Sequence, residues 1–247
     1  MKLPNLPYPS PDPDSPHMPV WTPSQFKTPK PNIFKGHPIE SYSLGETIAN
    51  SVSNGIAAAL AIAGLVVLVV LAALHGGGVR ILAALAFAVP MLLAFLMSTL
   101  YHALPGETPK RVFKVLGHDF VFFYIAGATT PFCTLLLGDT VGMALCSAEW
   151  VMAFVGVLVE SIWLSRPKWL PLVLCLAMGA VFVAFTPALY EALAPAGWWL
   201  LVAAGICFVL GIVFYLLRKL PYLWFVSHLV VMAGSVCLFL SVALFVI

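Results

Sequence analysis

Long apolar runs, separated by short polar stretches, fill the chain from about residue 49 to its last residue. A helix that crosses a membrane needs about 20 consecutive apolar residues, and seven of the runs have that length. Their approximate limits are 49–74, 80–103, 117–137, 141–164, 169–189, 197–217 and 222–246. This pattern predicts an all-α membrane protein, built as a bundle of seven transmembrane helices.

The composition agrees with this prediction. Hydrophobic residues make up 62% of the 247 residues and charged residues only 9%, whereas a soluble domain carries roughly 25% charged residues. The connections between the runs are short, for example LGDT and RKLP, and leave no room for a soluble domain. A net charge of +2 without a basic patch argues against a nucleic-acid-binding protein. The five cysteines are scattered singly, so neither a disulfide framework nor a thiolate metal site is expected.

The first 45 residues differ in kind, since they hold more than half of the chain's 20 prolines and no long apolar run. We therefore divide the chain into a Pro-rich cytoplasmic N-terminal arm, 1–45, and a transmembrane domain, 46–247. No secretory signal peptide is expected, because the first long apolar run begins only near residue 49. A Pro-rich arm is extended or disordered. It is either a flexible tail or a strap that docks onto a membrane-protein partner, and its Tyr8, Trp21 and Phe26 keep the second interpretation open.

The distribution of Lys and Arg predicts the orientation of the bundle. Of the 12 such residues, Arg80 alone lies on the side opposite the N-terminus. Because the cytoplasmic loops of membrane proteins carry the excess of basic residues, the N-terminus is predicted to be cytoplasmic and the C-terminus extracytoplasmic. The expected location is a bacterial inner (cytoplasmic) membrane.

Polar residues inside the predicted helices gather near the cytoplasmic ends. A charged group at the centre of a membrane-spanning helix costs about 2.5–3.5 kcal/mol on insertion scales, so the depth of such residues is informative. The first, second, third, fourth and seventh helices all contribute to this polar layer. Its members are Glu46, Asn50, Asn54, Ser98, His102, His118, Asp119, Glu160 and His228.

Each of these residues also has an ordinary structural explanation. A histidine near a helix end often caps the helix, and Ser and Asn often join membrane helices by hydrogen bonds. Their common depth, however, is not required by packing. Two histidines, an aspartate and a serine suit a zinc site with imidazole and carboxylate ligands and an open water position. A zinc-bound water of this kind hydrolyses amides or esters, and here the substrate would be a lipid.

Four segments resemble signatures of a known family. They are ETIANSVSNGI (Glu46–Ile56), STLYH (Ser98–His102), IAGATTP (Ile125–Pro131) and SHLVVMAGS (Ser227–Ser235). In their order, and in their positions within the first, second, third and seventh helices, they resemble the hemolysin III family, which belongs to the progestin and adipoQ receptor superfamily. The resemblance covers residues 40–247.

The resemblance implies a seven-helix bundle with a cytoplasmic N-terminus and a zinc site in the inner leaflet. It implies that zinc is held by His102 and by two histidines four residues apart in the seventh helix, of which His228 is the second. An aspartate at the start of the third helix and Ser98 would support a water. Relatives of this kind act as ceramidase-like hydrolases or in membrane-lipid homeostasis, so membrane lipids are the expected substrates or partners.

The sequence departs from the family pattern at three positions. The first histidine of the seventh helix is Trp224, the aspartate of the third helix is Gly117, and the usual histidine of the first motif is Asn54. Asp119 follows Gly117 by two residues, which turns its side chain by about 200° around the helix. Asp119 can therefore replace the lost aspartate only after a local rearrangement.

In a first hypothesis the chain is a hydrolase that cleaves a lipid amide or ester in the inner leaflet. Zinc would be bound by His102, His228 and Asp119, while Ser98 and Asp119 would position and activate water. His118 and Glu160 are alternative ligands. The remaining residues of the polar layer would support this site; they are Glu46, Asn50, Asn54, His118 and Glu160.

In a second hypothesis the chain is a metal-free, degenerate member of the family. It would then be a structural or assembly subunit of a larger membrane protein complex, with the Pro-rich arm as its strap. Trp224 and Gly117 favour this hypothesis, whereas Ser98, His102 and His228 favour the first. Two other classes are set aside: a retinal protein needs a lysine in its last helix, and a channel or transporter would spread charges through the depth of the bilayer.

Overall fold

The fold is that of a computed structural model, whose described residues are 42–138, 140–163, 169–218 and 220–247. The Pro-rich arm lies outside them except for its last four residues, so the interpretation of the arm as a tail or a strap stays a prediction. Within the described ranges every regular element is a helix, which confirms the predicted all-α fold. In chain order these helices are α1 (Leu44–Leu74), α2 (Gly78–Ala103), α3 (Glu107–Pro131), η3 (Phe132–Leu137), α4 (Thr140–Ser161), α5 (Leu170–Ala184), α6 (Thr186–Ala192), α7 (Pro195–Leu216) and α8 (Leu223–Phe245).

The helices lie close to the predicted membrane spans. Among the described residues, six spans are long and apolar enough to cross a membrane, with α3 and η3 counted as one, and the bent pair α5 and α6 is a seventh if it forms a single broken span. The largest difference is at the start of α3, which begins at Glu107 rather than near residue 117. The polar stretch ETPKRVFK therefore continues the helix beyond its apolar part. The chain has the architecture of a helical membrane bundle.

The fifth predicted span, 169–189, is broken, because α5 and α6 meet at an angle of 49°. Pro187 has no N–H and cannot bond to the carbonyl oxygen of Val183 one turn earlier. The hydroxyl group of Thr186 donates to that carbonyl oxygen instead, at 2.8 Å. The proline thus ends α5, and a hydroxyl group satisfies the carbonyl that the proline leaves without a donor.

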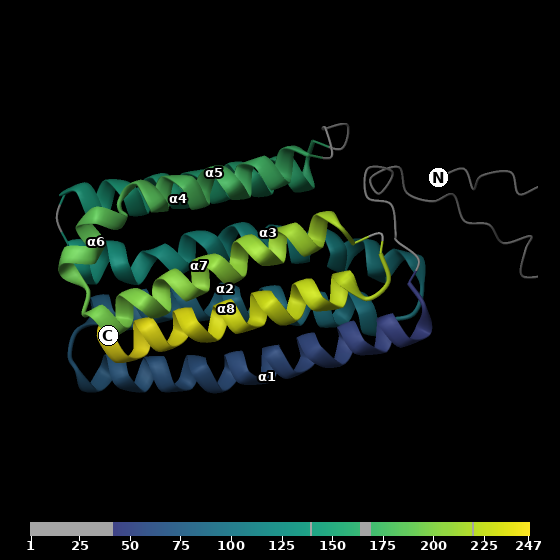
Figure 1. The fold of residues 1–247 in the computed structure, drawn as a ribbon, viewed down its shortest axis with the longest axis horizontal. Helices are drawn as coiled ribbons and strands as arrows, with labels where there is room; N and C mark the ends of the chain where they lie inside the picture. The colour runs from purple at the N-terminus through teal and green to yellow at the C-terminus, as the bar shows by residue number, and fades with distance from the viewer. Residues whose placement is uncertain (1–41, 139, 164–168, 219) are drawn as a thin grey trace, which may run out of the picture. The chain divides into compact units, whose positions relative to one another are not determined.

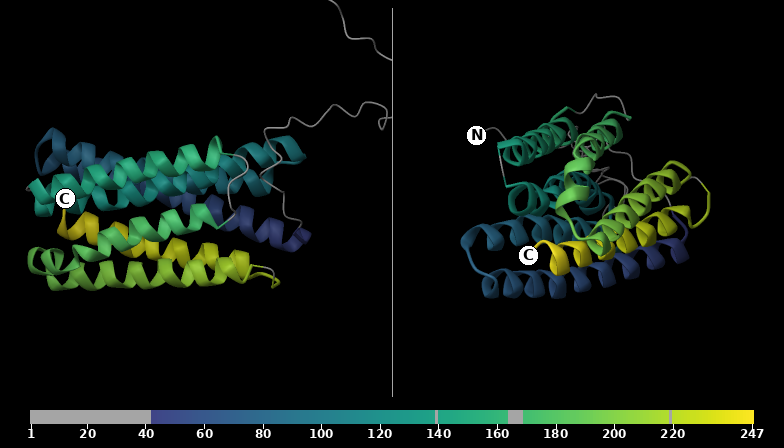
Figure 2. Two further views of the ribbon diagram at one scale, coloured as in Figure 1. Left: turned by 90° about the horizontal axis from the view of Figure 1, so that it is seen from above. Right: turned by 60° about the vertical axis from the view of Figure 1, so that its left-hand side comes forward.

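The long helices lie side by side (Figure 1). α1 packs on α2 and α8, α8 also packs on α7, and α3 lies between α2 and α4. The two further views show the helices running along nearly the same direction (Figure 2). α6 and the C-terminus lie at one end of the bundle, and α1 and α8 both begin at the other end. The polar layer belongs to this second end, where α2 finishes and α3 begins.

Small residues allow the helices to approach closely. The main buried cluster between α1, α2 and α8 contains many alanines, among them Ala61, Ala84 and Ala88, packed with Phe87 and Leu238. In a membrane the lipid is as apolar as a leucine side chain, so close van der Waals packing, rather than burial from water, holds such helices together. The helices that carry Ser98, His102 and His228 are positioned by this contact.

Gly127 marks a very close contact between α2 and α3. A Cβ atom added at this position would lie 2.1 Å from the carbonyl oxygen of Ala86. Backbone atoms cannot rotate away as a flexible side chain can, so any larger residue must push the two helices apart. The spacing of α2 and α3 therefore depends on this glycine.

We expect the substitution Gly127→Ala to lower the free energy of unfolding by about 1–3 kcal/mol, the usual cost of overpacking a well-packed core. Gly179→Ala on α5 is the matched control, because nothing lies within 4 Å of a Cβ atom there. Thermal unfolding in detergent can be followed by a maleimide dye, whose signal rises above the reaction of the three partly exposed cysteines as the buried Cys133 and Cys146 become exposed. Equal melting temperatures for the Gly127 variant and the wild type would contradict the close packing of α2 on α3.

The orientation of the bundle stays a prediction that fusion proteins can test. We expect alkaline phosphatase fused after Ile247 to be active and green fluorescent protein at the same point to be dark, because the excess of basic loops places the C-terminus outside the cytoplasm. Enzyme activity and fluorescence of the two fusions, normalised to their expression, measure this directly. If the green fluorescent protein fusion fluoresced and the alkaline phosphatase fusion were inactive, the C-terminus would lie in the cytoplasm and the predicted orientation would be wrong.

Candidate functional site

His228, on α8, is held in one orientation by two hydrogen bonds. Its Nδ1 lies 3.0 Å from the carbonyl oxygen of Trp224, one turn earlier, and its Nε2 lies 3.2 Å from Oγ of Ser98 on α2. A carbonyl oxygen can only accept, so Nδ1 carries the hydrogen. In the neutral ring Nε2 then accepts a hydrogen bond from the Ser98 hydroxyl. The structure thus joins two predicted site residues that lie 130 residues apart in the sequence.

His102, at the end of α2, lies beside this pair. Its ring centroid is 6.0 Å from that of His228, and the two rings are nearly perpendicular, at 89°. The side chain is only 3% exposed, and its Nε2 has no hydrogen-bond partner in the described part of the chain. Burying such a nitrogen without a partner is costly. This nitrogen is therefore the first atom of the cluster to consider for binding a ligand.

Trp224 occupies the position where the resemblance implies a zinc-binding histidine. Its side chain is 8% exposed, and its Nε1 likewise has no partner among the described residues. The ring centroid lies 6.3 Å from that of His102 and 5.8 Å from that of His228. Tyr42 and Tyr215 also contact the indole ring, with centroids at 5.5 Å and 5.4 Å. The indole thus forms the third corner of a triangle with the two imidazoles.

Asp119 and His118 contact α4. The hydroxyl of Ser161 donates to Oδ2 of Asp119 at 2.6 Å, and Nδ1 of His118 donates to Oε1 of the fully buried Glu160 at 2.8 Å. These contacts join the middle of α3 to the end of α4. The structure does not bring Asp119 together with the two cluster histidines into a group of three that could hold a metal ion.

Gly117, where the resemblance implies an aspartate, faces α2. A Cβ atom at this position would lie 3.8 Å from Cβ of Met97, the residue before Ser98. Asp119 lies two residues further on, where the helix has turned by about 200°, and it contacts α4 instead. The face of α3 that would direct a carboxylate toward α2 therefore carries none at residue 117.

The polar residues of α1 stabilise the end of the bundle that holds the site. Ser43 and Glu46 form a capping box, with hydrogen bonds of 3.2 Å and 3.0 Å. The carboxylate of Glu46 also accepts a hydrogen bond from the backbone N–H of Tyr222 at 2.8 Å, which links α1 to the turn before α8. The side-chain amides of Asn50 and Asn54 donate to backbone carbonyls one turn earlier. Within the described ranges, neither Oδ1 atom accepts a hydrogen bond.

The donor set around His102 and His228 does not fit the three-ligand zinc site that the resemblance implies. Two imidazoles bound to one tetrahedral zinc have ring centroids roughly 5 Å apart, close to the distance seen here. Trp224 occupies the third corner, however, and an indole N–H has no lone pair to donate. In the described part of the chain no group of three or more His, Cys, Asp or Glu side chains could hold a metal ion. The described residues of the cluster therefore offer a hydroxyl group, two imidazoles and an indole N–H.

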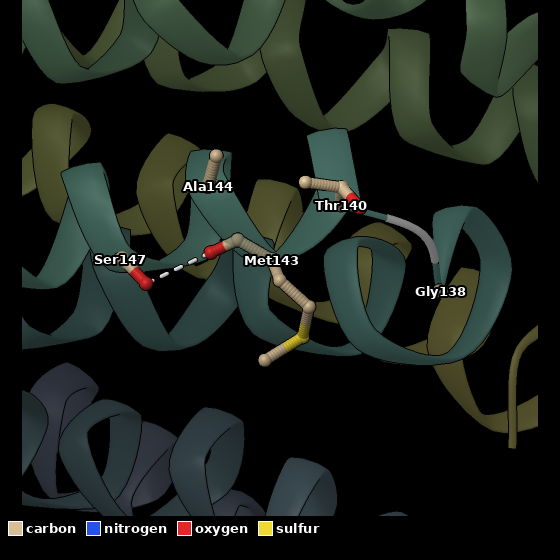
Figure 3. Close-up of a pocket in the computed structure, with 5 residues that line it drawn as sticks. All are labelled: Gly138, Thr140, Met143, Ala144 and Ser147. Carbon is tan, nitrogen blue, oxygen red and sulfur yellow. Dashed lines mark hydrogen bonds between the residues drawn. The ribbon is translucent and has the colours of Figure 1, made fainter.

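A shallow hollow lies on α4, close to its first residues (Figure 3). Its described lining consists of Gly138, Thr140, Met143, Ala144 and Ser147, and includes no acid or base. The hydroxyl of Ser147 donates to the backbone carbonyl of Met143 at 2.8 Å. Ser147 is thus an exposed serine without a catalytic neighbour in the hollow, and it provides a useful control for Ser98.

Some contributors were missed by the sequence analysis. Ser161 could have been recognised from the sequence, because it follows Glu160 just as Asp119 follows His118. The two bonded pairs, His118–Glu160 and Asp119–Ser161, are each separated by 42 residues. Tyr42 lies outside the apolar runs and Tyr222 is the first residue of the last one, so neither stands out as a polar residue inside a predicted helix. Their roles depend on how the ends of α1 and α8 meet.

Comparison with known proteins confirms the resemblance seen in the motifs. The family model described as Haemolysin-III related matches residues 42–239. The chain is 32% identical over 202 residues to "Hemolysin-3" of Bacillus cereus, covering 82% of this chain and 92% of that protein. It is also 32% identical over 201 residues to "Hemolysin-3 homolog" of Bacillus subtilis (strain 168), covering 81% and 94% of the two chains. The chain therefore belongs to the haemolysin III family and is an integral membrane protein.

Proposed function

We propose that this protein is a hydrolase of the bacterial cytoplasmic membrane that cleaves an ester or amide bond of a membrane lipid. The observation that carries the proposal is the cluster of Ser98, His102 and His228. It combines a hydroxyl group, an oriented imidazole that can accept its proton, and a second, buried imidazole whose Nε2 has no partner among the described residues. These are the groups that acyl-bond hydrolysis requires.

The position of the cluster favours a lipid as the substrate. Both α2 and α8 are apolar spans, and the cluster lies at the ends of these helices that the basic loops predict to be cytoplasmic. A soluble substrate would have to leave water to enter an apolar bundle, whereas the acyl bonds of lipids lie close to that depth. The Bacillus origin of both relatives supports the cytoplasmic membrane as the location.

The residues divide the work between proton transfer and charge stabilisation. His228 is oriented by the Trp224 carbonyl so that Nε2 can take a proton from a hydroxyl group, and a positioned base of this kind contributes typically about 10²–10⁴-fold to a rate. In this proposal the buried Nε2 of His102, whose ring centroid lies 6.0 Å from that of His228, contacts the carbonyl oxygen of the substrate. Zinc would polarise that oxygen or activate a water if it were bound. Whether the protein binds zinc is tested apart from the hydrolase activity, with the Trp224 variant described below.

A second set of contacts favours a different function, that of a metal-free structural or assembly subunit of a larger membrane complex. The pairs Asp119–Ser161 and His118–Glu160 use predicted site residues to join α3 to α4. Trp224 packs among aromatic rings as a core residue does. In this proposal the polar layer stabilises the bundle, and an outer apolar face such as that of α7 contacts a partner.

We expect the purified protein, reconstituted into vesicles of bacterial membrane lipids, to release fatty acids. His228→Ala should lower the rate at least about 100-fold by removing the base. The control is Ser147→Ala, on the exposed face of α4, which should keep the wild-type rate. Mass spectrometry of the released fatty acids provides the measurement. A wild-type rate equal to that of protein-free vesicles would refute the hydrolase and favour the subunit.

We also expect Trp224→His to raise the zinc content of the purified protein to about one ion per chain, since it adds a third imidazole beside His102 and His228. The wild type should contain clearly less. Trp199→His, at an exposed position of α7, is the matched control. Zinc is measured by mass spectrometry after dialysis in detergent. One zinc in both the wild type and the Trp224 variant would contradict the two-imidazole description of the site.

A further inference from the structure

We infer that Ser98 is the nucleophile of a metal-independent acyl transfer, with His228 as its base and the ring nitrogens of His102 and Trp224 as the donors that hold the oxyanion. The inference rests on the proposed function and specifies its chemistry. It assigns Ser98 a covalent role in place of the water-positioning role implied by the resemblance. It also assigns a role to Trp224, the residue that departs most from the family pattern.

The first support is the fixed tautomer of His228. The Trp224 carbonyl oxygen, 3.0 Å from Nδ1, requires a hydrogen on Nδ1, so the lone pair of the neutral ring is on Nε2. That lone pair faces Oγ of Ser98 at 3.2 Å. A hydroxyl hydrogen-bonded to a base that a third group orients is the arrangement found at activated serines. Here the third group is a backbone carbonyl.

The second support is a pair of buried nitrogens on two rings that lie beside the imidazole of the base. Nε2 of His102 and Nε1 of Trp224 have no hydrogen-bond partner in the part of the chain that the structure describes. Both side chains are more than nine-tenths buried, and their ring centroids lie 6.0 Å and 5.8 Å from that of His228. An oxyanion hole consists of N–H donors next to the nucleophile. The indole N–H is such a donor at all pH values, and the Nε2–H tautomer of His102 is a second.

The replacement of histidine by tryptophan at residue 224 changes the chemistry of the cluster. A histidine at this position would offer a lone pair to a metal, whereas the indole offers a hydrogen to an anion. At the same time Gly117 removes the carboxylate that would face α2. Both departures lower the affinity of the cluster for a cation and suit a developing negative charge. The two changes are therefore consistent with one another.

The acylation step balances without a metal. As Oγ of Ser98 forms a bond to the carbonyl carbon of the lipid, its proton passes to Nε2 of His228. The carbonyl π electrons move to the oxygen, where the two N–H groups stabilise them. Collapse of this tetrahedral intermediate breaks the bond to the leaving oxygen, which takes the proton from His228. The products are an acyl-serine and an alcohol.

Water completes the reaction. It attacks the acyl-serine while giving a proton to His228, and collapse of the second intermediate returns that proton to Oγ of Ser98 and releases a fatty acid. Because a carbonyl rather than a carboxylate orients His228, the positively charged ring is stabilised less than in a full triad. The substrate class is therefore a lipid carboxylic ester, whose leaving group departs more readily than that of an amide.

A long-chain alkyl fluorophosphonate tests the nucleophile directly. This probe forms a P–O bond with an activated serine and loses fluoride, while the base takes the serine proton. We expect the folded, detergent-purified protein to be modified at Ser98, as located by mass spectrometry of its peptides, with or without the zinc chelator 1,10-phenanthroline. Ser98→Ala should abolish the modification and Ser147→Ala should not change it. Absence of modification at Ser98, or its loss with the chelator, would overturn the inference.

Two further variants separate the assigned roles. His228→Asn should slow the modification by about 10²-fold or more through loss of the base. Trp224→Phe keeps an aromatic ring but removes the N–H, and should slow it by about 10²–10³-fold. Melting temperatures show whether each variant is folded, and a folded Trp224→Phe protein that reacts at the wild-type rate would overturn the donor role.

The outcome for the inference is distinct from that for the proposed function. Fatty-acid release without modification of Ser98 would leave the hydrolase standing and overturn the serine nucleophile. Modification of Ser98 without fatty-acid release would support the nucleophile and overturn lipid hydrolysis. If neither fatty-acid release nor modification of Ser98 is detected, both the proposed function and the inference are overturned.

Discussion

Polar side chains buried between membrane helices depend on partners inside the protein, because the surrounding lipid offers no hydrogen bonds. This constraint organises the polar end of the bundle. The buried Asp119 and Glu160 bond to Ser161 and His118, and at the exposed edge of the bundle the carboxylate of Glu46 accepts the N–H of Tyr222. Each pair joins two helices, or a helix and a turn, so these bonds hold α1, α3, α4 and α8 in register.

Against this background, the polar atoms that lack a protein partner in the described ranges are informative. Four of them, on Asn50, Asn54, His102 and Trp224, belong to the same end of the bundle. Packing alone does not explain them, since a buried donor or acceptor without a partner costs roughly 1–3 kcal/mol. A ligand, a substrate oxygen or a bound water would satisfy these atoms. The rings of His102 and Trp224 lie next to that of His228, and their unpartnered nitrogens are the physical reason to regard this end as a site rather than only a joint between helices.

Close packing and the polar contacts act together on this site. Gly127 sets the spacing of α2 and α3, and α2 carries Ser98 and His102. The link between Glu46 and Tyr222 fixes the turn before α8, which carries Trp224 and His228. Tyr222 has a φ of 60°, a strained value for a residue with a side chain, so this turn is stabilised by its neighbours rather than by local preference. The geometry of the cluster therefore depends on contacts some distance from it.

The sequence by itself determined the class of fold, the approximate places of the apolar spans and the family. Apolar runs of spanning length have few alternatives in a membrane, and the four family motifs keep their order along the chain. It also singled out Ser98, His102 and His228 as candidates, because polar residues at one depth stand out against apolar helices. Asp119 shows where this reasoning ends: the 200° rotation was evident, but only the packing of α3 on α4 decided that Ser161 is its partner. The surroundings of Trp224 were likewise decided by tertiary structure, since nothing local determines which rings surround an indole or whether its N–H finds a partner. Periodicity and composition are local properties of the chain, whereas the side chains that meet across a bundle depend on how the helices are rotated and spaced.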